Sequence, residues 1–164
     1  MTNDQQNMPP PRNGRIDDAK EKIPKHNKYN FQLIHRGSRD GFNVTIMCKK
    51  CEKKGAFILI IKTNESDAVI GGYNHFGIKL KRYGSCEWVN TTDSFIFSLD
   101  DRKDLKISRV ANQNYANYGL NFGDSDLVIT GNAGTCKQKY YESKILDTDK
   151  FTIKEMEVFT FKVE

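Results

Sequence analysis

Short apolar runs separated by turn residues determine what this chain can fold into. Each run has the length of a β-strand and is too short for a buried helix of ordinary length. No proline follows Pro24, so Gly, Asn and Asp must form the turns between the runs. The seven runs are residues 31–35, 56–62, 68–73, 94–99, 105–110, 127–130 and 152–163. This pattern predicts a chain rich in β-structure.

Two hairpins are predicted from neighbouring runs. Residues 56–73 form the first, and residues 94–110 form the second around a polar loop at 100–104. The double glycine Gly71-Gly72 in the first hairpin indicates a bulge or a close approach of another part of the chain. Residues 115–123, where aromatic residues stand between glycines, are predicted as a loop.

One segment has helical spacing. Val44, Met47, Cys48 and Cys51 recur at i, i+3, i+4 and i+7, which places them on one face of a helix. Asn43 is predicted to cap its N-terminus, and Gly55 marks where we expect it to end. Residues 36–41, with two glycines and an Asp-Gly pair, predict a turn before it. Many strands and one clear helix indicate a β-rich α+β domain built as a two-sheet sandwich.

The N-terminal part differs in composition from the rest. Residues 1–30 carry all four prolines and only one of the 18 aromatic residues. We expect a disordered tail at 1–30 and a folded domain at 31–164. No secretory leader or membrane-spanning run is recognisable, so we expect a cytoplasmic protein that does not insert into membranes.

The net charge of +5 is not concentrated in one part of the chain. Residues 1–30 contribute +2, and the remaining residues contribute +3. A nucleic-acid-binding protein usually concentrates its basic residues in one stripe. We therefore expect a solvated surface of mixed charge and keep nucleic-acid association as an alternative.

The four cysteines include one close pair, Cys48-x-x-Cys51. A four-cysteine zinc site needs a second close pair, and Cys86 and Cys136 are 50 residues apart. Because both members of the pair share the apolar helix face, we expect them to pack in the core and expect no metal. A thiol-based redox role for Cys48 and Cys51 remains an alternative.

Catalytic motifs are not recognisable in the chain. The histidines His26, His35 and His75 lie in no known nucleophile motif, and the glycine pairs do not open a helix. Glu155 and Glu157 share one face of the last strand. They form either a solvated sheet face or an acidic strip that meets a basic partner.

Seven segments together resemble the TLDc domain family. They occur in the order in which the family has them and span about residues 31–162. The segments are LIHRGSRDGF at 33–42, CEKKG at 51–55, IGGY at 70–73, FIFSL at 95–99, YG with FG at 118–123, DLVI at 126–129 and FTIKEMEVF at 151–159.

The resemblance implies two antiparallel sheets packed as a sandwich with a few peripheral helices. It also implies no cofactor and a non-catalytic, protein-binding role in resistance to oxidative stress. Several family members bind the vacuolar proton pump (V-ATPase), so its subunits are the expected partners of a monomeric protein without a small-molecule substrate. The expected motif or partner-contact residues are Ser38, Arg39, Asp40, Gly41, Gly71, Gly72, Asp126 and Glu157.

The sequence departs from animal members of the family at two places. The helical segment that precedes their first strand, often with a Leu-Pro pair, is not recognised here. Gly123-Asp124-Ser125 stands where those members are richer in glycine.

Overall fold

The computed structural model describes residues 28–164. The predicted tail at 1–30 therefore lies almost entirely outside the described residues.

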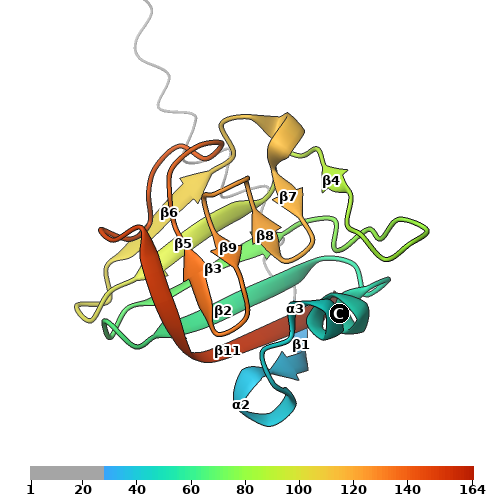
Figure 1. Ribbon diagram of the computed structural model, residues 1–164, viewed down its shortest axis with the longest axis horizontal. Helices are drawn as coiled ribbons and strands as arrows, with labels where there is room; N and C mark the ends of the chain where they lie inside the picture. The colour runs from blue at the N-terminus through green and yellow to red at the C-terminus, as the bar shows by residue number, and fades with distance from the viewer. Residues whose placement is uncertain (1–27) are drawn as a thin grey trace, which may run out of the picture.

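A large antiparallel sheet forms most of the molecule (Figure 1). Its strands follow the order β6-β5-β3-β2-β11-β10-β9, and β1 pairs with β11 beside this path. The strands are β1 (Tyr29–Arg36), β2 (Phe57–Thr63), β3 (Val69–Asn74), β5 (Phe95–Leu99), β6 (Leu105–Arg109), β9 (Val128–Ile129), β10 (Ala133–Thr135) and β11 (Lys150–Val163). Both predicted hairpins, β2–β3 and β5–β6, are confirmed.

The long strand β11 organises this sheet. One of its edges pairs with β2 from Ile153 to Thr160. On the opposite edge, β10 pairs with its beginning and β1 with its end. The first and last described strands are therefore neighbours, although they are at opposite ends of the sequence.

A small second sheet packs on the large one. It consists of β4 (Trp88–Val89), β7 (Asn117–Tyr118) and β8 (Asn121–Phe122), and the short 3₁₀ helix η1 (Gln113–Tyr115) precedes β7. The ring of Phe122 reaches the large sheet at Gly72. The β-rich fold with two antiparallel sheets and few helices is thus as predicted. The prediction of a loop at 115–123 was wrong, because β7 and β8 form a tight hairpin there.

The double glycine in β3 serves a close approach and not a bulge. Its register with β2 is continuous through Gly71 and Gly72. A Cβ atom on Gly71 would lie 1.9 Å from the Leu59 carbonyl oxygen, and one on Gly72 would lie 2.4 Å from the Phe122 ring. Only glycine leaves room for both neighbours.

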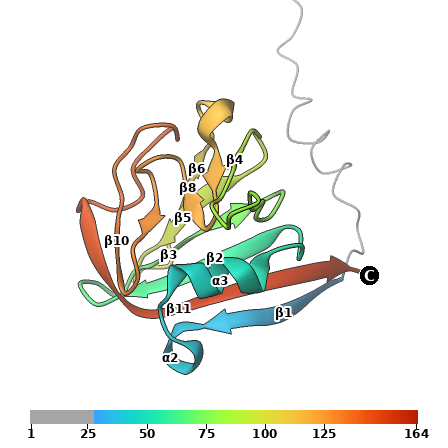
Figure 2. The same cartoon turned by 45° about the vertical axis from the view of Figure 1, so that its right-hand side comes forward.

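Two short helices follow β1. The first, α2 (Gly37–Asp40), occupies the predicted turn and ends at Gly41, whose φ of 89° suits glycine. The second, α3 (Val44–Cys51), packs beside β1 and runs roughly along the strands of the sheet (Figure 2). The Asn43 side chain accepts a hydrogen bond from the Ile46 N–H at 3.1 Å, which confirms the predicted cap.

The predicted end of α3 near Gly55 was too late. Glu52 already has an extended backbone, and Lys53 has a φ of 61°. The helix therefore stops at Cys51. Met47, Cys48 and Cys51 are buried on its inner face, as the helical spacing predicts. Among residues 28–164, no helix has the length and apolar character that crossing a membrane requires.

Candidate functional site

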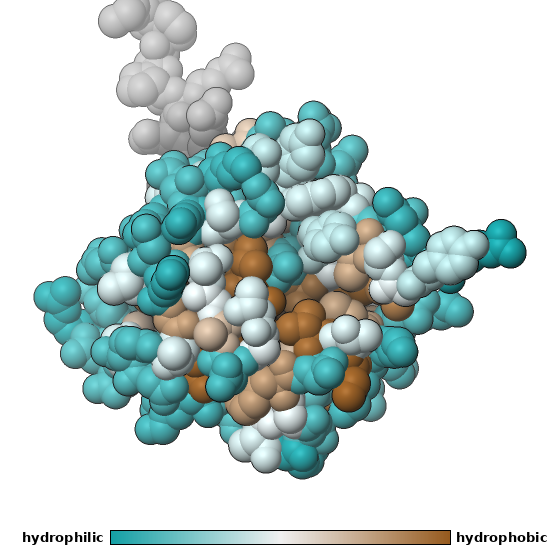
Figure 3. All heavy atoms as spheres, viewed as in Figure 1, coloured by the Kyte–Doolittle hydropathy of each residue, from teal (hydrophilic) through white to brown (hydrophobic). Residues whose placement is uncertain are grey.

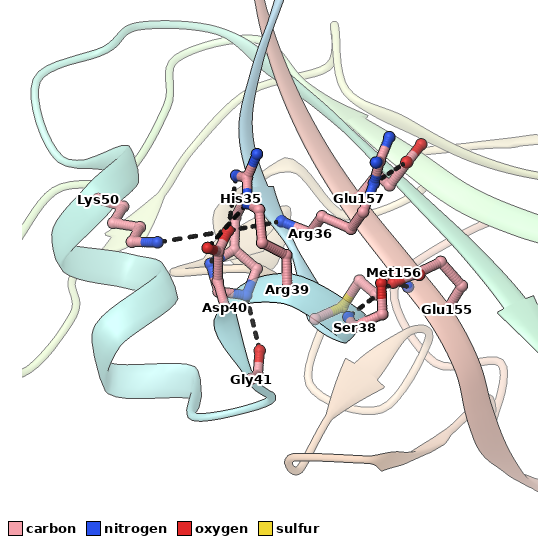
Figure 4. Close-up of polar contacts among 10 residues, drawn as sticks. All are labelled: His35, Arg36, Ser38, Arg39, Asp40, Gly41, Lys50, Glu155, Met156 and Glu157. Atoms are coloured by element: carbon pink, nitrogen blue, oxygen red, sulfur yellow. Dashed lines mark hydrogen bonds and ion pairs between the residues drawn. The ribbon is translucent and has the colours of Figure 1, made fainter.

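Many of the predicted site residues meet where β1, α2, α3 and β11 come together. We call this group the α2 corner (Figure 4). Its members are His35, Arg36, Ser38, Arg39, Asp40, Gly41, Lys50, Glu155 and Glu157. The reversal of the chain at Gly41 sets α2 between β1 and α3, and the pairing of β1 with β11 brings Glu155 and Glu157 to the same place.

Asp40 is the centre of the corner. Its carboxylate accepts two hydrogen bonds from Arg39, at 2.9 and 2.7 Å, and one from the Arg36 backbone N–H at 3.0 Å. Lys50 of α3 adds its ammonium group at 3.4 Å. The hydrogen bonds from Arg39 and Arg36 and the two positive charges hold the pKa of Asp40 well below its usual range. Asp40 therefore stays ionised and ties α2 to α3.

Glu155 and Glu157 of β11 hold the start of α2 and the end of β1, respectively. The Arg36 Nε atom donates to Glu157 at 2.7 Å, and the Ser38 N–H donates to Glu155 at 3.0 Å. Partial burial opposes ionisation of Glu155, but the hydrogen bonds from Ser38 and Met156 outweigh it and lower its pKa. Both carboxylates thus already have partners within the chain, which leaves less of the acidic strip open to another protein.

His35 lies beneath the corner and is fully buried. Its Nε2 atom lies 2.7 Å from the Gly41 carbonyl oxygen, which can only accept, so Nε2 carries the proton. The other ring nitrogen, Nδ1, lies 3.8 Å from Asp40. This histidine therefore fixes the turn that shapes the corner.

The chain matches the family model described as TLDc domain over residues 15–162. The chain belongs to the TLDc family. No curated protein matches the chain. The match begins before residue 31, within the segment interpreted as a tail, and the boundary between tail and domain stays a prediction.

The remaining motif residues of this TLDc chain lie elsewhere. Gly71 and Gly72 are buried in β3, and Asp126 is 2% exposed. The Asp126 carboxylate accepts hydrogen bonds from the backbone N–H groups of Lys139, Tyr140 and Tyr141, at 2.7 to 3.1 Å. In this conformation Asp126 holds the segment that follows β10. A direct contact of any of these residues with a partner stays a prediction.

The cysteines of this TLDc domain are free thiols, and three of the four are buried. Burial raises the pKa of Cys48 to about 12 and the pKa of Cys51 to about 11. If Gly119 carried a Cβ atom, that atom would lie 2.8 Å from the Cys86 sulfur and 3.5 Å from the Cys48 sulfur, so both thiols lie close to the Gly119 backbone. A thiolate is the reactive form of cysteine, so these surroundings make Cys48 and Cys51 poor nucleophiles.

The chemistry available at the α2 corner is ionic. Its carboxylates are paired with basic groups or backbone N–H groups, and its histidine is buried. Among the residues that the structure describes, no three His, Cys, Asp or Glu side chains are grouped to hold a metal. The side chains of Arg36 and Arg39 remain 45% and 55% exposed. This arrangement can present guanidinium groups to another protein.

Sequence reasoning did not identify two members of this arrangement. No motif or spacing singles out Lys50, and His35 stands in the sequence only as a histidine outside any known nucleophile motif. Lys50 pairs with the Asp40 carboxylate, and His35 is hydrogen-bonded to the Gly41 carbonyl oxygen, so both contact the turn at 36–41. The helix spacing places Lys50 near the last turn of α3 but contains no signal for its partner.

Proposed function

We propose that this protein is a non-catalytic TLDc module that binds a protein partner in the response to oxidative stress. The observation that carries this proposal is the family match over residues 15–162. The α2 corner agrees with it, because its guanidinium groups are exposed and held by ion pairs and because it contains no activated nucleophile. We place the module in the cytoplasm as a monomer.

The partner that we propose is the V-ATPase. Several members of the family bind this pump, which is the reason for choosing it. Arg36 and Arg39 at the α2 corner are suited to carboxylate groups on such a partner, because guanidinium groups bind carboxylates through two parallel hydrogen bonds. Each of the two already holds a carboxylate within the chain, and a partner would add to or replace these contacts.

A genetic complementation experiment tests the stress-related part of the proposal. Cells lacking the protein are given the wild-type chain or the double variant Cys48→Ser/Cys51→Ser, and survival in peroxide is counted. We expect the deletion to lower survival and both chains to restore it equally. Normal survival of the deletion strain contradicts the proposal. Failure of only the serine variant, at a normal protein level, favours the thiol alternative.

A further inference from the structure

The strand β6 has an open edge. It pairs with β5 on one side. On its other side, the Glu142 N–H donates to the Arg109 carbonyl oxygen at 2.9 Å. Backbone groups alternate in direction along a strand, so Leu105 and Ile107 direct their N–H and C=O groups to the same side as Arg109. No residue within 28–164 is hydrogen-bonded to them there.

The side chains along this open edge are apolar. Leu105 is 61% exposed and Ile107 is 42% exposed. They stand opposite Leu99 and Phe97 of β5, which are themselves only half-buried. An added strand would cover this apolar surface and satisfy the open backbone groups at the same time.

An acidic cleft adjoins the same end of β6. Its volume is about 570 Å³, and it lies between the β2–β3 turn, the β5–β6 turn and the segment that leads into β11. Leu105 and Lys106 line it, so the cleft is continuous with the open edge. Figure 3 shows a hydrophilic surface on the left, where Figure 1 places these turns.

Negative charge dominates this cleft. Six carboxylates face one ammonium group, that of Lys106. The carboxylates belong to Glu65, Asp67, Asp100, Asp101, Asp104 and Asp147. Of these, Glu65 already accepts hydrogen bonds from Thr152, and Asp100 lies 3.8 Å from Arg102. Most of the negative charge has no partner within residues 28–164.

We propose that the β6 edge binds an extended, basic segment of a partner protein as an added strand. Alternate apolar side chains of that segment cover Leu105 and Ile107. The Lys or Arg residues between them point to the other face of the sheet, into the acidic cleft. The proposal names a contact surface for the partner binding proposed above and rests on it.

A second copy of this chain fits the edge poorly. The β6 strand of a second copy would bring only Lys106 and Arg109 as basic groups, against the six carboxylates of the cleft. It would also bring its own acidic turn, because Asp100, Asp101 and Asp104 directly precede β6, and like charges at a contact oppose association. A basic segment from another protein is therefore the occupant that charge complementarity selects.

The test uses labelled heptapeptides and the purified full chain. A peptide of alternating Lys and Val is titrated by fluorescence anisotropy. It is compared with a Glu–Val peptide and with a Lys–Val peptide that is N-methylated at alternate residues. We expect binding of the first peptide only, weakened by added salt because the charges lie at the surface. Equal binding of the N-methylated peptide, or no binding of the first, overturns the proposal.

Charge variants locate the binding. The triple variant Asp101→Asn/Asp104→Asn/Asp147→Asn changes exposed side chains only, and we expect it to bind about tenfold more weakly. The matched control Glu87→Gln, which lies outside the cleft, should bind like the wild type. Unchanged binding by the triple variant overturns the proposal, as does an equal loss in the control.

These results are separable from the fate of the proposed function. Peptide binding needs only the purified chain. If no peptide binds, the β6 edge is not the contact surface, but capture of a partner from cells can still succeed. Capture of no partner in cells contradicts the proposed function even when the peptide binds.

Discussion

The ring of Phe122 fills the space into which a side chain on Gly72 would project. The separation between the Phe122 Cζ atom and a Cβ on Gly72 would be 2.4 Å, far inside van der Waals contact. This contact joins β8 of the small sheet to β3 of the large sheet, and both residues lie in segments that resemble the TLDc family.

Replacing Gly72 tests this contact. We expect Gly72→Ala to lower the free energy of unfolding by about 1–3 kcal/mol, because a methyl group there overfills a close-packed interface. Urea denaturation measures the change. In the double variant Gly72→Ala/Phe122→Leu, the smaller side chain should recover part of the loss. Strictly additive losses would show that the two residues do not share this space.

Asp126 should matter more for stability than an exposed carboxylate. Asp126→Ala leaves three buried or half-buried backbone N–H groups without an acceptor. We expect a loss of about 3 kcal/mol or more, since hydrogen bonds to charged groups contribute about 1.5–3 kcal/mol each. Asp126→Asn keeps one acceptor oxygen and should lose less. Urea denaturation at neutral pH distinguishes the two variants. An Ala variant as stable as the wild type would contradict this role.

The low pKa of Asp40 makes its contribution depend on pH. Such a group stabilises the folded state fully above the pKa of the unfolded chain, about 4, and the contribution is lost as pH falls through the lower folded pKa. We expect Asp40→Asn to be less stable than the wild type at pH 6 and this gap to shrink toward pH 2. Thermal unfolding across this range measures it. Asp101→Asn serves as a matched exposed control and should show no such gap. A gap for Asp40→Asn that stays constant with pH would refute the assignment.

Thiol accessibility gives a prediction for the cysteines. With an aromatic disulfide reagent near pH 8, the native protein should react rapidly at Cys86 alone, because the other three cysteines are buried. All four should react in denaturant. Burial raises the pKa of Cys86 as well as those of Cys48 and Cys51, so access to the sulfur atom is what favours Cys86. Rapid labelling of Cys48 and Cys51 in the native protein would restore the redox alternative.

The sequence predicts those elements whose pattern is local. The paired runs at 56–73 and 94–110 are hairpins, and the spacing of Met47, Cys48 and Cys51 identifies the buried face of α3. The strands β7 and β8 were not predicted, because each has only two residues and two residues are too few to show an alternating pattern. The end of α3 was misplaced because Lys53 adopts a positive φ that its residue type does not suggest.

The candidate site was predictable in its residues but not in its contacts. The motif segments identified Asp40 and Glu157, yet the partner of Glu157 is Arg36, which is 121 residues away in the chain. No local pattern encodes such a pairing. It arises because β1 and β11 are neighbours in the sheet. The same holds for the acidic cleft, which two turns and the segment leading into β11 build together.

Affinity purification of the tagged full chain from its own cells, with and without peroxide, tests the central claim most directly. We predict that a specific protein partner is enriched over a tag-only control, with V-ATPase subunits among the enriched proteins. Enrichment of no protein above the control, with or without peroxide, would contradict the account.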